Sequence, residues 1–190
     1  TPDQPVALAG QFHTRISKGV DNPVTATAVA IESRSGDQVV DQAILVSHDL
    51  VMVSAGVLPP LRERLGKKLP DFDARKLVLT ATHTHTAPVT YDFYKIPETG
   101  VMTPQEYVAF LVDRLEEVIV NAWKQRKPGG VAWGLGHAVV GHNRRSVYAN
   151  GTAQMYGSTN KPDFRGLEAC EDHALEILFF WNQGQPQPLA

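Results

Sequence analysis

Several features that would define a protein class are scarce in this 190-residue sequence. Its one cysteine, Cys170, excludes an internal disulfide framework and a cysteine-rich zinc site. Its 18 basic and 20 acidic residues leave a formal net charge of −2, so we expect no surface that attracts nucleic acid. No apolar run approaches the length that spans a bilayer, so we expect no transmembrane segment.

The composition that remains, 43% hydrophobic and 20% charged, is ordinary for a globular domain with a sizeable core. We expect one domain over residues 1–190. The chain begins with Thr1 rather than Met, so we expect that a leader was removed and that the protein is secreted or periplasmic. Only a turn-like segment, 182–190, follows the last expected strand. We therefore expect an N-terminal portion of a longer protein, or a second polypeptide that completes the fold.

The order of apolar patterns predicts an α/β fold. A Ser-Arg-Ser-Gly-Asp turn between two β-branched runs predicts a hairpin, and Thr103-Pro104-Gln105-Glu106 has the features of a helix cap. A late run, ALEILFFW, predicts a strand buried on both faces. The expected strands are 24–32, 39–47, 76–82, 131–140 and 174–181, the expected helices are 54–69 and 104–126, and residues 86–102 are expected to form a long loop. This order predicts a mixed β-sheet core, with layered sheets flanked by helices and incomplete in this chain.

The segment 80–88 (TATHTHTAP) carries the most informative pair, His83 and His85. In an extended strand the side chains at these two positions point the same way, at a separation suited to one metal ion or one polar reacting group. Neutral imidazole is a common zinc ligand, so a metal-dependent hydrolase is the first hypothesis. The alternative is a pair of ordinary histidines at the end of a strand.

Two further segments bring polar side chains to strand ends, where α/β proteins place their sites. In Gly-His-Asn-Arg-Arg, Arg144 offers a positive fork for a carboxylate, phosphate or oxyanion, and Asn143 can orient a carbonyl or an amide. The alternative is a solvated turn. In Val-Ser-His-Asp-Leu, Asp49 is expected either to hold a metal-bound imidazole or to cap the following helix.

Taken in chain order, VSHDL, THTHTAP, the capped helix and HNRR resemble the neutral, non-lysosomal ceramidase family over roughly residues 7–185. The family marker is similar to His-Thr-His-Ser-Gly-Pro and is followed by an Asn-Arg-Ser element. This sequence departs from the marker, with Thr86-Ala87-Pro88 in place of Ser-Gly-Pro and Arg145 after Asn-Arg. The chain then corresponds to the N-terminal part of a ceramidase-like catalytic domain.

The resemblance implies a zinc-dependent amide hydrolase that cleaves an N-acyl amide, such as a ceramide-like lipid, to a fatty acid and an amine. It implies that His83 is a metal ligand for Zn²⁺ and that His85 and Arg144 are catalytic. We also expect Asn143 and Asp49 to contact substrate. Zinc suits this reaction because it lowers the pKa of bound water to about 7 and polarises the amide carbonyl. The family's remaining ligands, a histidine, a glutamate and a tyrosine, are expected beyond this stretch.

Other functions stay open. A non-catalytic ceramidase-like fragment would act as a binding or assembly module. A metal-dependent hydrolase of another class, acting on a non-lipid substrate, would also use His-x-His after a strand. Barrel amidohydrolases need a longer chain, and metallo-β-lactamase-like proteins usually place an aspartate where this sequence has Ala87.

Overall fold

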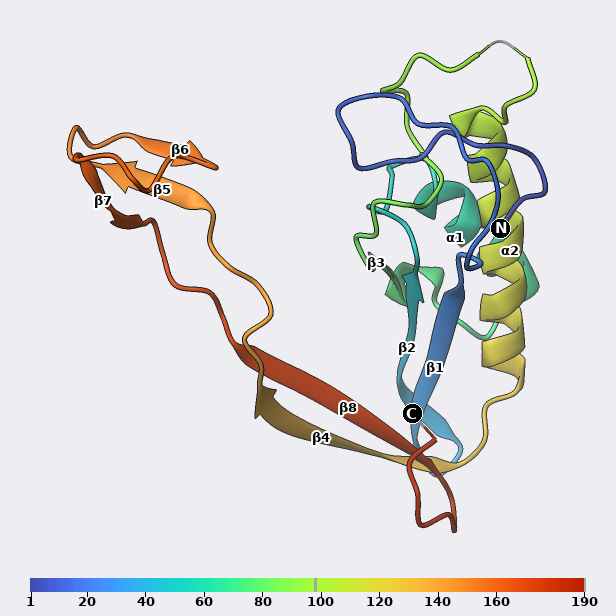
Figure 1. The fold of residues 1–190 in the computed structure, drawn as a ribbon. Coiled ribbons are helices and arrows are strands. Elements are labelled where there is room, and N and C mark those ends of the chain that lie inside the picture. The colour runs from blue at the N-terminus through green and yellow to red at the C-terminus, as the bar shows by residue number, and fades with distance from the viewer. Residues whose placement is uncertain (98, 190) are drawn as a thin grey trace. The chain divides into compact units, whose positions relative to one another are not determined.

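The computed structural model describes residues 1–97 and 99–189, and its elements fall into two units. The first unit is Thr1–Arg126 and the second is Lys127–Ala190 (Figure 1). Each unit is described by itself. The expectation of one domain over residues 1–190 stays a prediction.

The first unit is built on a three-stranded mixed sheet with the order β1-β2-β3. Its strands are β1 (Ala26–Ser35), β2 (Gln38–His48) and β3 (Leu77–Ala81). The predicted hairpin is confirmed, because β1 and β2 pair antiparallel across a turn that contains Gly36 at a φ of 59°. β3 lies parallel to β2, from Ile44 opposite Leu77 to His48 opposite Ala81. The sheet therefore ends beside the loop that carries the two histidines.

Both predicted helices are present, as α1 (Leu58–Lys68) and α2 (Pro104–Lys124). A 3₁₀ turn, η1 (Ala74–Lys76), was not predicted. The predicted cap of α2 is confirmed: Thr103 Oγ1 accepts a hydrogen bond from the Glu106 N–H, and the Glu106 side chain accepts one from the Thr103 N–H. α1 begins with prolines in its first turn, which costs no helical hydrogen bond there.

α1 and α2 share one hydrophobic core with the sheet. β2 contributes alternate residues, Ile44 and Val46, because successive strand residues face opposite ways. The helices contribute residues at helical spacing: Leu61 and Leu65 of α1, and Leu111, Leu115, Ile119 and Trp123 of α2. Burial of each such side chain contributes about 1.5–3 kcal/mol to folding.

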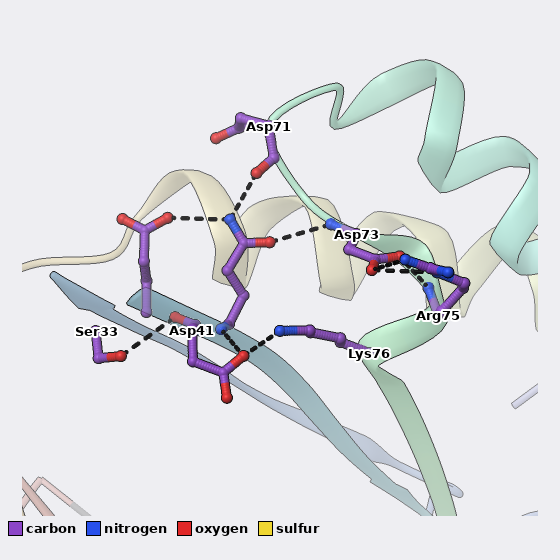
Figure 2. A network of polar contacts seen from close by, with 8 residues as sticks. Ser33, Asp41, Asp71, Asp73, Arg75 and Lys76 are labelled. Atoms are coloured by element: carbon purple, nitrogen blue, oxygen red, sulfur yellow. Dashed lines mark hydrogen bonds and ion pairs between the residues drawn. The ribbon is translucent and has the colours of Figure 1, made fainter. Parts of the chain in front are cut away.

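A polar network joins β2 to the segment that leads into β3 (Figure 2). The Gln42 side-chain amide donates to the Asp71 carbonyl over 2.7 Å and accepts from the Asp73 N–H over 3.1 Å. The ammonium of Lys76 also pairs with the carboxylate of Asp41. These contacts lie just before the parallel pairing begins, so they help to set its register.

In the second unit, β4 (Gly129–His137) and β8 (Ala174–Asn182) form a two-stranded antiparallel sheet. Both strands were predicted. The prediction that β8 is buried on both faces is wrong for the described residues. Leu175 and Leu178 of β8 are 48% and 49% exposed, and Trp133 of β4 is 79% exposed. The apolar composition indicated burial, whereas β8 has one paired strand and no covering layer among the described residues of its unit.

A second sheet of this unit was not predicted. It consists of β5 (Arg145–Tyr148), β6 (Ala153–Met155) and β7 (Phe164–Leu167), in the order β6-β5-β7. Strands of three or four residues carry too little periodicity to be recognised. The predicted fold class, α/β with a mixed β-sheet core, is confirmed. Among the described residues, no helix is long and apolar enough to cross a bilayer.

Candidate functional site

His83 and His85 lie in the loop that follows β3, and their imidazole rings converge. The prediction of an extended strand at this pair is wrong, because β3 ends at Ala81 and His83 has a φ of 61°. The ring centroids are nevertheless 4.9 Å apart in an edge-to-face arrangement, and the two Nε2 atoms are 3.3 Å apart. The turn of the loop, rather than strand alternation, therefore brings the two ring nitrogens together.

Two backbone carbonyls hold His83 in this position. Its N–H donates to the Leu50 carbonyl over 3.0 Å, and its Nδ1 lies 2.6 Å from the Val51 carbonyl oxygen. Because a carbonyl oxygen only accepts, Nδ1 carries the proton and Nε2 presents a lone pair. A metal-binding histidine is oriented in this way by its second nitrogen.

The N-terminal segment holds the backbone around His85. The guanidinium of Arg15 donates to the carbonyls of His85 and Ala9, the latter over 3.2 Å. The Ala9 N–H donates to the Ala87 carbonyl over 2.9 Å, next to His85 in the loop. Sequence reasoning missed Arg15 and Val51, and no local pattern marks them, because their partners are 70 and 32 residues away.

The spacing of the two Nε2 atoms fits one tetrahedral zinc ion. Two nitrogens bound at about 2.0–2.1 Å to one such ion lie about 3.3 Å apart, and the observed separation is 3.3 Å. A complete site needs further ligands, and residues 1–97 and 99–189 contain no group of three or more His, Cys, Asp or Glu able to hold a metal. The two nitrogens are therefore spaced either as two ligands of one ion or as one ligand with a second imidazole within hydrogen-bond reach of it.

Asp49 follows the last residue of β2 and has a structural task. Its Oδ2 accepts hydrogen bonds from the Thr25 N–H and hydroxyl over 3.0 and 2.7 Å, and its Oδ1 accepts from the Thr82 hydroxyl over 3.2 Å. The hydrogen bonds from Thr25 hold the pKa of the Asp49 carboxyl below its ordinary 3.8. Asp49 thus ties the start of β1 to the residue before His83, and neither of the roles expected for it at the imidazole or at a helix cap is observed. Its contact with substrate stays a prediction.

Asn143 and Arg144 belong to the second unit, just before β5. The Asn143 side chain donates to the Ala169 carbonyl over 3.0 Å and accepts from the Arg145 N–H over 2.9 Å, so it shapes its own turn. Arg144 is exposed, donates to the Tyr156 hydroxyl over 2.9 Å and stacks over that ring at 5.0 Å. The structure thus brings His83 and His85 together, and the place of Asn143 and Arg144 beside them stays a prediction.

The fold and the paired imidazoles define an α/β protein with a two-histidine candidate metal site after a parallel strand. No family model matches the chain. The chain is 28% identical to the neutral ceramidase of Pseudomonas aeruginosa over 157 residues, which is 82% of this chain and 22% of that protein. The expected resemblance to the neutral ceramidase family is therefore confirmed.

Two solved structures share the fold. The crystal structure of neutral ceramidase from Pseudomonas aeruginosa superimposes with a TM-score of 0.65 at 23% identity, and a ceramidase complexed with C2 superimposes with a TM-score of 0.58 at 23% identity. Each match covers 95% of this chain and 27% of the solved chain. This chain therefore spans less than a third of the length of the proteins that it resembles.

Proposed function

We propose that the protein containing this chain is a zinc-dependent amide hydrolase of the ceramidase type. It cleaves the amide bond of an N-acyl amide, such as a ceramide-like lipid, to a fatty acid and an amine. The observation that carries the proposal is the 3.3 Å separation of the His83 and His85 Nε2 atoms, with His83 Nδ1 fixed on the Val51 carbonyl. The similarity to neutral ceramidase supports the reaction class.

His83 holds zinc through Nε2 in this proposal, and the other ligands come from parts of the protein outside this chain. Zinc held there would supply a water molecule with its pKa lowered to about 7 and would polarise the amide carbonyl. The Val51 carbonyl accepts a hydrogen bond from His83 Nδ1 and so favours the tautomer that leaves a lone pair on Nε2.

His85 is proposed to move a proton at Nε2. An amide nitrogen leaves poorly unless it is protonated, and a histidine within hydrogen-bond reach is suited to deliver that proton. Arg144 is proposed to stabilise the oxyanion of the tetrahedral intermediate, because a guanidinium keeps its charge and offers a rigid fork of donors. Asn143 and Asp49 are proposed to contact the polar part of the substrate.

A location outside the cytoplasm, secreted or periplasmic, is part of the same proposal. A non-catalytic binding or assembly module is the competing function. The absence of a group of three metal-binding residues from the described part of the chain favours it if no further ligand is supplied.

Zinc analysis of the full-length protein tests the metal assignment. We expect about one zinc per wild-type molecule, little in His83→Ala, and wild-type zinc in His137→Ala, which removes an exposed histidine at the end of β4. Equal zinc in His83→Ala and wild type would refute the site.

The substrate is tested with the same three proteins. N-acylsphingosine and simple N-acyl amino acids are compared at matched concentrations. Hydrolysis of the lipid alone supports the ceramide-like substrate, hydrolysis of the amino acid derivatives alone supports the non-lipid class, and hydrolysis of neither supports the binding module.

A further inference from the structure

A small second core of the first unit is formed by Ala7, Ala9, Val51 and Val89, and His83 contacts it at the Val51 carbonyl. This core is separate from the one between the sheet and the helices. The N–H of Val89 donates to the Ala7 carbonyl and the N–H of Ala9 to the Ala87 carbonyl, both over 2.9 Å. The N-terminal segment is therefore paired directly with the strand-like stretch that follows His85.

This pairing places Gly10 against the His85 side chain. A Cβ atom built on Gly10 would lie 2.6 Å from the His85 Cβ and 2.7 Å from its Nδ1, and closer still to its Cγ. Carbon atoms do not approach one another that closely without displacement. Only a residue without a side chain allows the His85 ring to keep its position.

A displaced His85 ring loses its contact with His83. Gly10 meets the Cβ end of the ring, while Nε2 at the other end is 3.3 Å from His83 Nε2. The His85 backbone is also held, because the Arg15 guanidinium donates to the carbonyls of His85 and of Ala9, the residue before Gly10. A side chain at position 10 would therefore turn the ring away from His83.

We propose that Gly10 and Arg15 are positioning residues that hold the His85 imidazole beside His83. Gly10 acts by leaving space for the ring, and Arg15 acts by holding the His85 and Ala9 carbonyls together. The positioning itself does not depend on the proposed reaction. Its effect on catalysis rests on the proposed hydrolase function, because it requires that His85 transfers a proton.

Crystal structures of full-length wild type, Gly10→Ala and Gly36→Ala test the positioning without any assay of activity. Gly36 is a matched control: it also has a positive φ, 59° against 92° at Gly10, but a Cβ there meets nothing within 4 Å. We expect the two Nε2 atoms to remain within hydrogen-bond distance in wild type and Gly36→Ala and to separate in Gly10→Ala. An unmoved His85 ring in Gly10→Ala would overturn the proposal.

Arg15 variants keep the proposal testable if Gly10→Ala does not fold. Arg15→Gln removes the guanidinium donors, and Arg15→Lys retains the charge with a donor of similar reach. We expect the histidine rings to separate in Arg15→Gln and to return at least partly toward each other in Arg15→Lys. Identical ring positions in wild type and Arg15→Gln would contradict the role of Arg15.

Kinetics then connect the positioning to the reaction. A displacement of about 1 Å at a reacting group costs on the order of a hundredfold in rate, so we expect that loss in kcat for Gly10→Ala, with the zinc content and KM unchanged. Gly36→Ala should retain wild-type kcat. If the wild-type protein is inactive but the rings separate in Gly10→Ala, the hydrolase function is refuted and the positioning stands. If the ring is displaced in Gly10→Ala but kcat is unchanged, the link between positioning and catalysis is refuted.

Discussion

The Nδ1 atom of His83 lies 2.6 Å from the carbonyl oxygen of Val51, and this contact assigns the tautomer of the imidazole. Val51 is buried in the second core, so the carbonyl that selects the tautomer belongs to a packed part of the fold. A metal ligand that depended on a mobile side chain for orientation would be less well defined. The same core also places Gly10 against His85, so one packing unit positions both imidazoles.

Replacing His85 tests whether metal binding and proton transfer are separate tasks, as the proposed function requires. We expect His85→Ala to retain most of the zinc, because His83 remains, and to lose about 10²- to 10⁴-fold in kcat, the usual contribution of a general acid or base. Zinc analysis and kinetics of the full-length protein measure the two quantities, with His142→Ala as an exposed histidine control. Loss of zinc together with activity would instead make His85 a second ligand.

Asp49 is expected to make the protein sensitive to strong acid. Its folded-state pKa lies below 3.8, chiefly because of the Thr25 hydrogen bonds, so the unfolded chain binds the proton more readily. Its stabilising contribution is complete above pH 3.8 and is lost as the pH falls through the folded-state pKa. Urea unfolding of Asp49→Asn should show a smaller loss of stability between pH 5 and 3 than wild type or exposed Asp21→Asn. An identical pH profile in all three would contradict the assignment.

His48 is expected to make the stability of the fold depend on pH in a milder range than Asp49 does. It is 2% exposed, and neither ring nitrogen has a hydrogen-bond partner among the described residues. Burial lowers its pKa from the ordinary 6.5, so the unfolded chain binds the proton first and stability falls as the pH drops below 6.5.

A His48→Leu variant tests this by urea unfolding at pH 7.5 and 5.5. We expect a free energy of unfolding within about 1 kcal/mol of wild type at pH 7.5, because the lost imidazole leaves no partner unsatisfied. The free energy of unfolding should fall less between pH 7.5 and pH 5.5 in this variant than in wild type. A fall as large as in wild type would show that another group is responsible.

Gln42 is expected to stabilise the connection between β2 and β3. Gln42→Ala removes two hydrogen bonds to the backbone of Asp71 and Asp73, each worth about 0.5–1.5 kcal/mol. We therefore expect the free energy of unfolding to fall by about 1–3 kcal/mol, measured in urea at pH 7.5. In the control variant Gln38→Ala, at the exposed start of β2, the free energy of unfolding should fall by less than half as much. An equal effect of both substitutions would argue against a specific role of the network in Figure 2.

Sequence patterns predicted the elements whose determinants are local. The α2 cap needs only Thr103 and Glu106, three residues apart, and both of its hydrogen bonds are present. The β1–β2 hairpin needs only a turn between two β-branched runs. The surroundings of β8 were predicted wrongly, because an apolar strand indicates that it can be buried but not what covers it.

For the candidate site, the sequence by itself determined the pair of imidazoles, their place after a strand and the resemblance to neutral ceramidase. Residue type and short spacing carry that information. The tertiary structure alone decided that a left-handed backbone at His83, rather than an extended strand, directs the rings toward each other, and that Val51, Gly10 and Arg15 hold them. These residues come from segments 32 to 75 positions away, and only the folded chain brings them together.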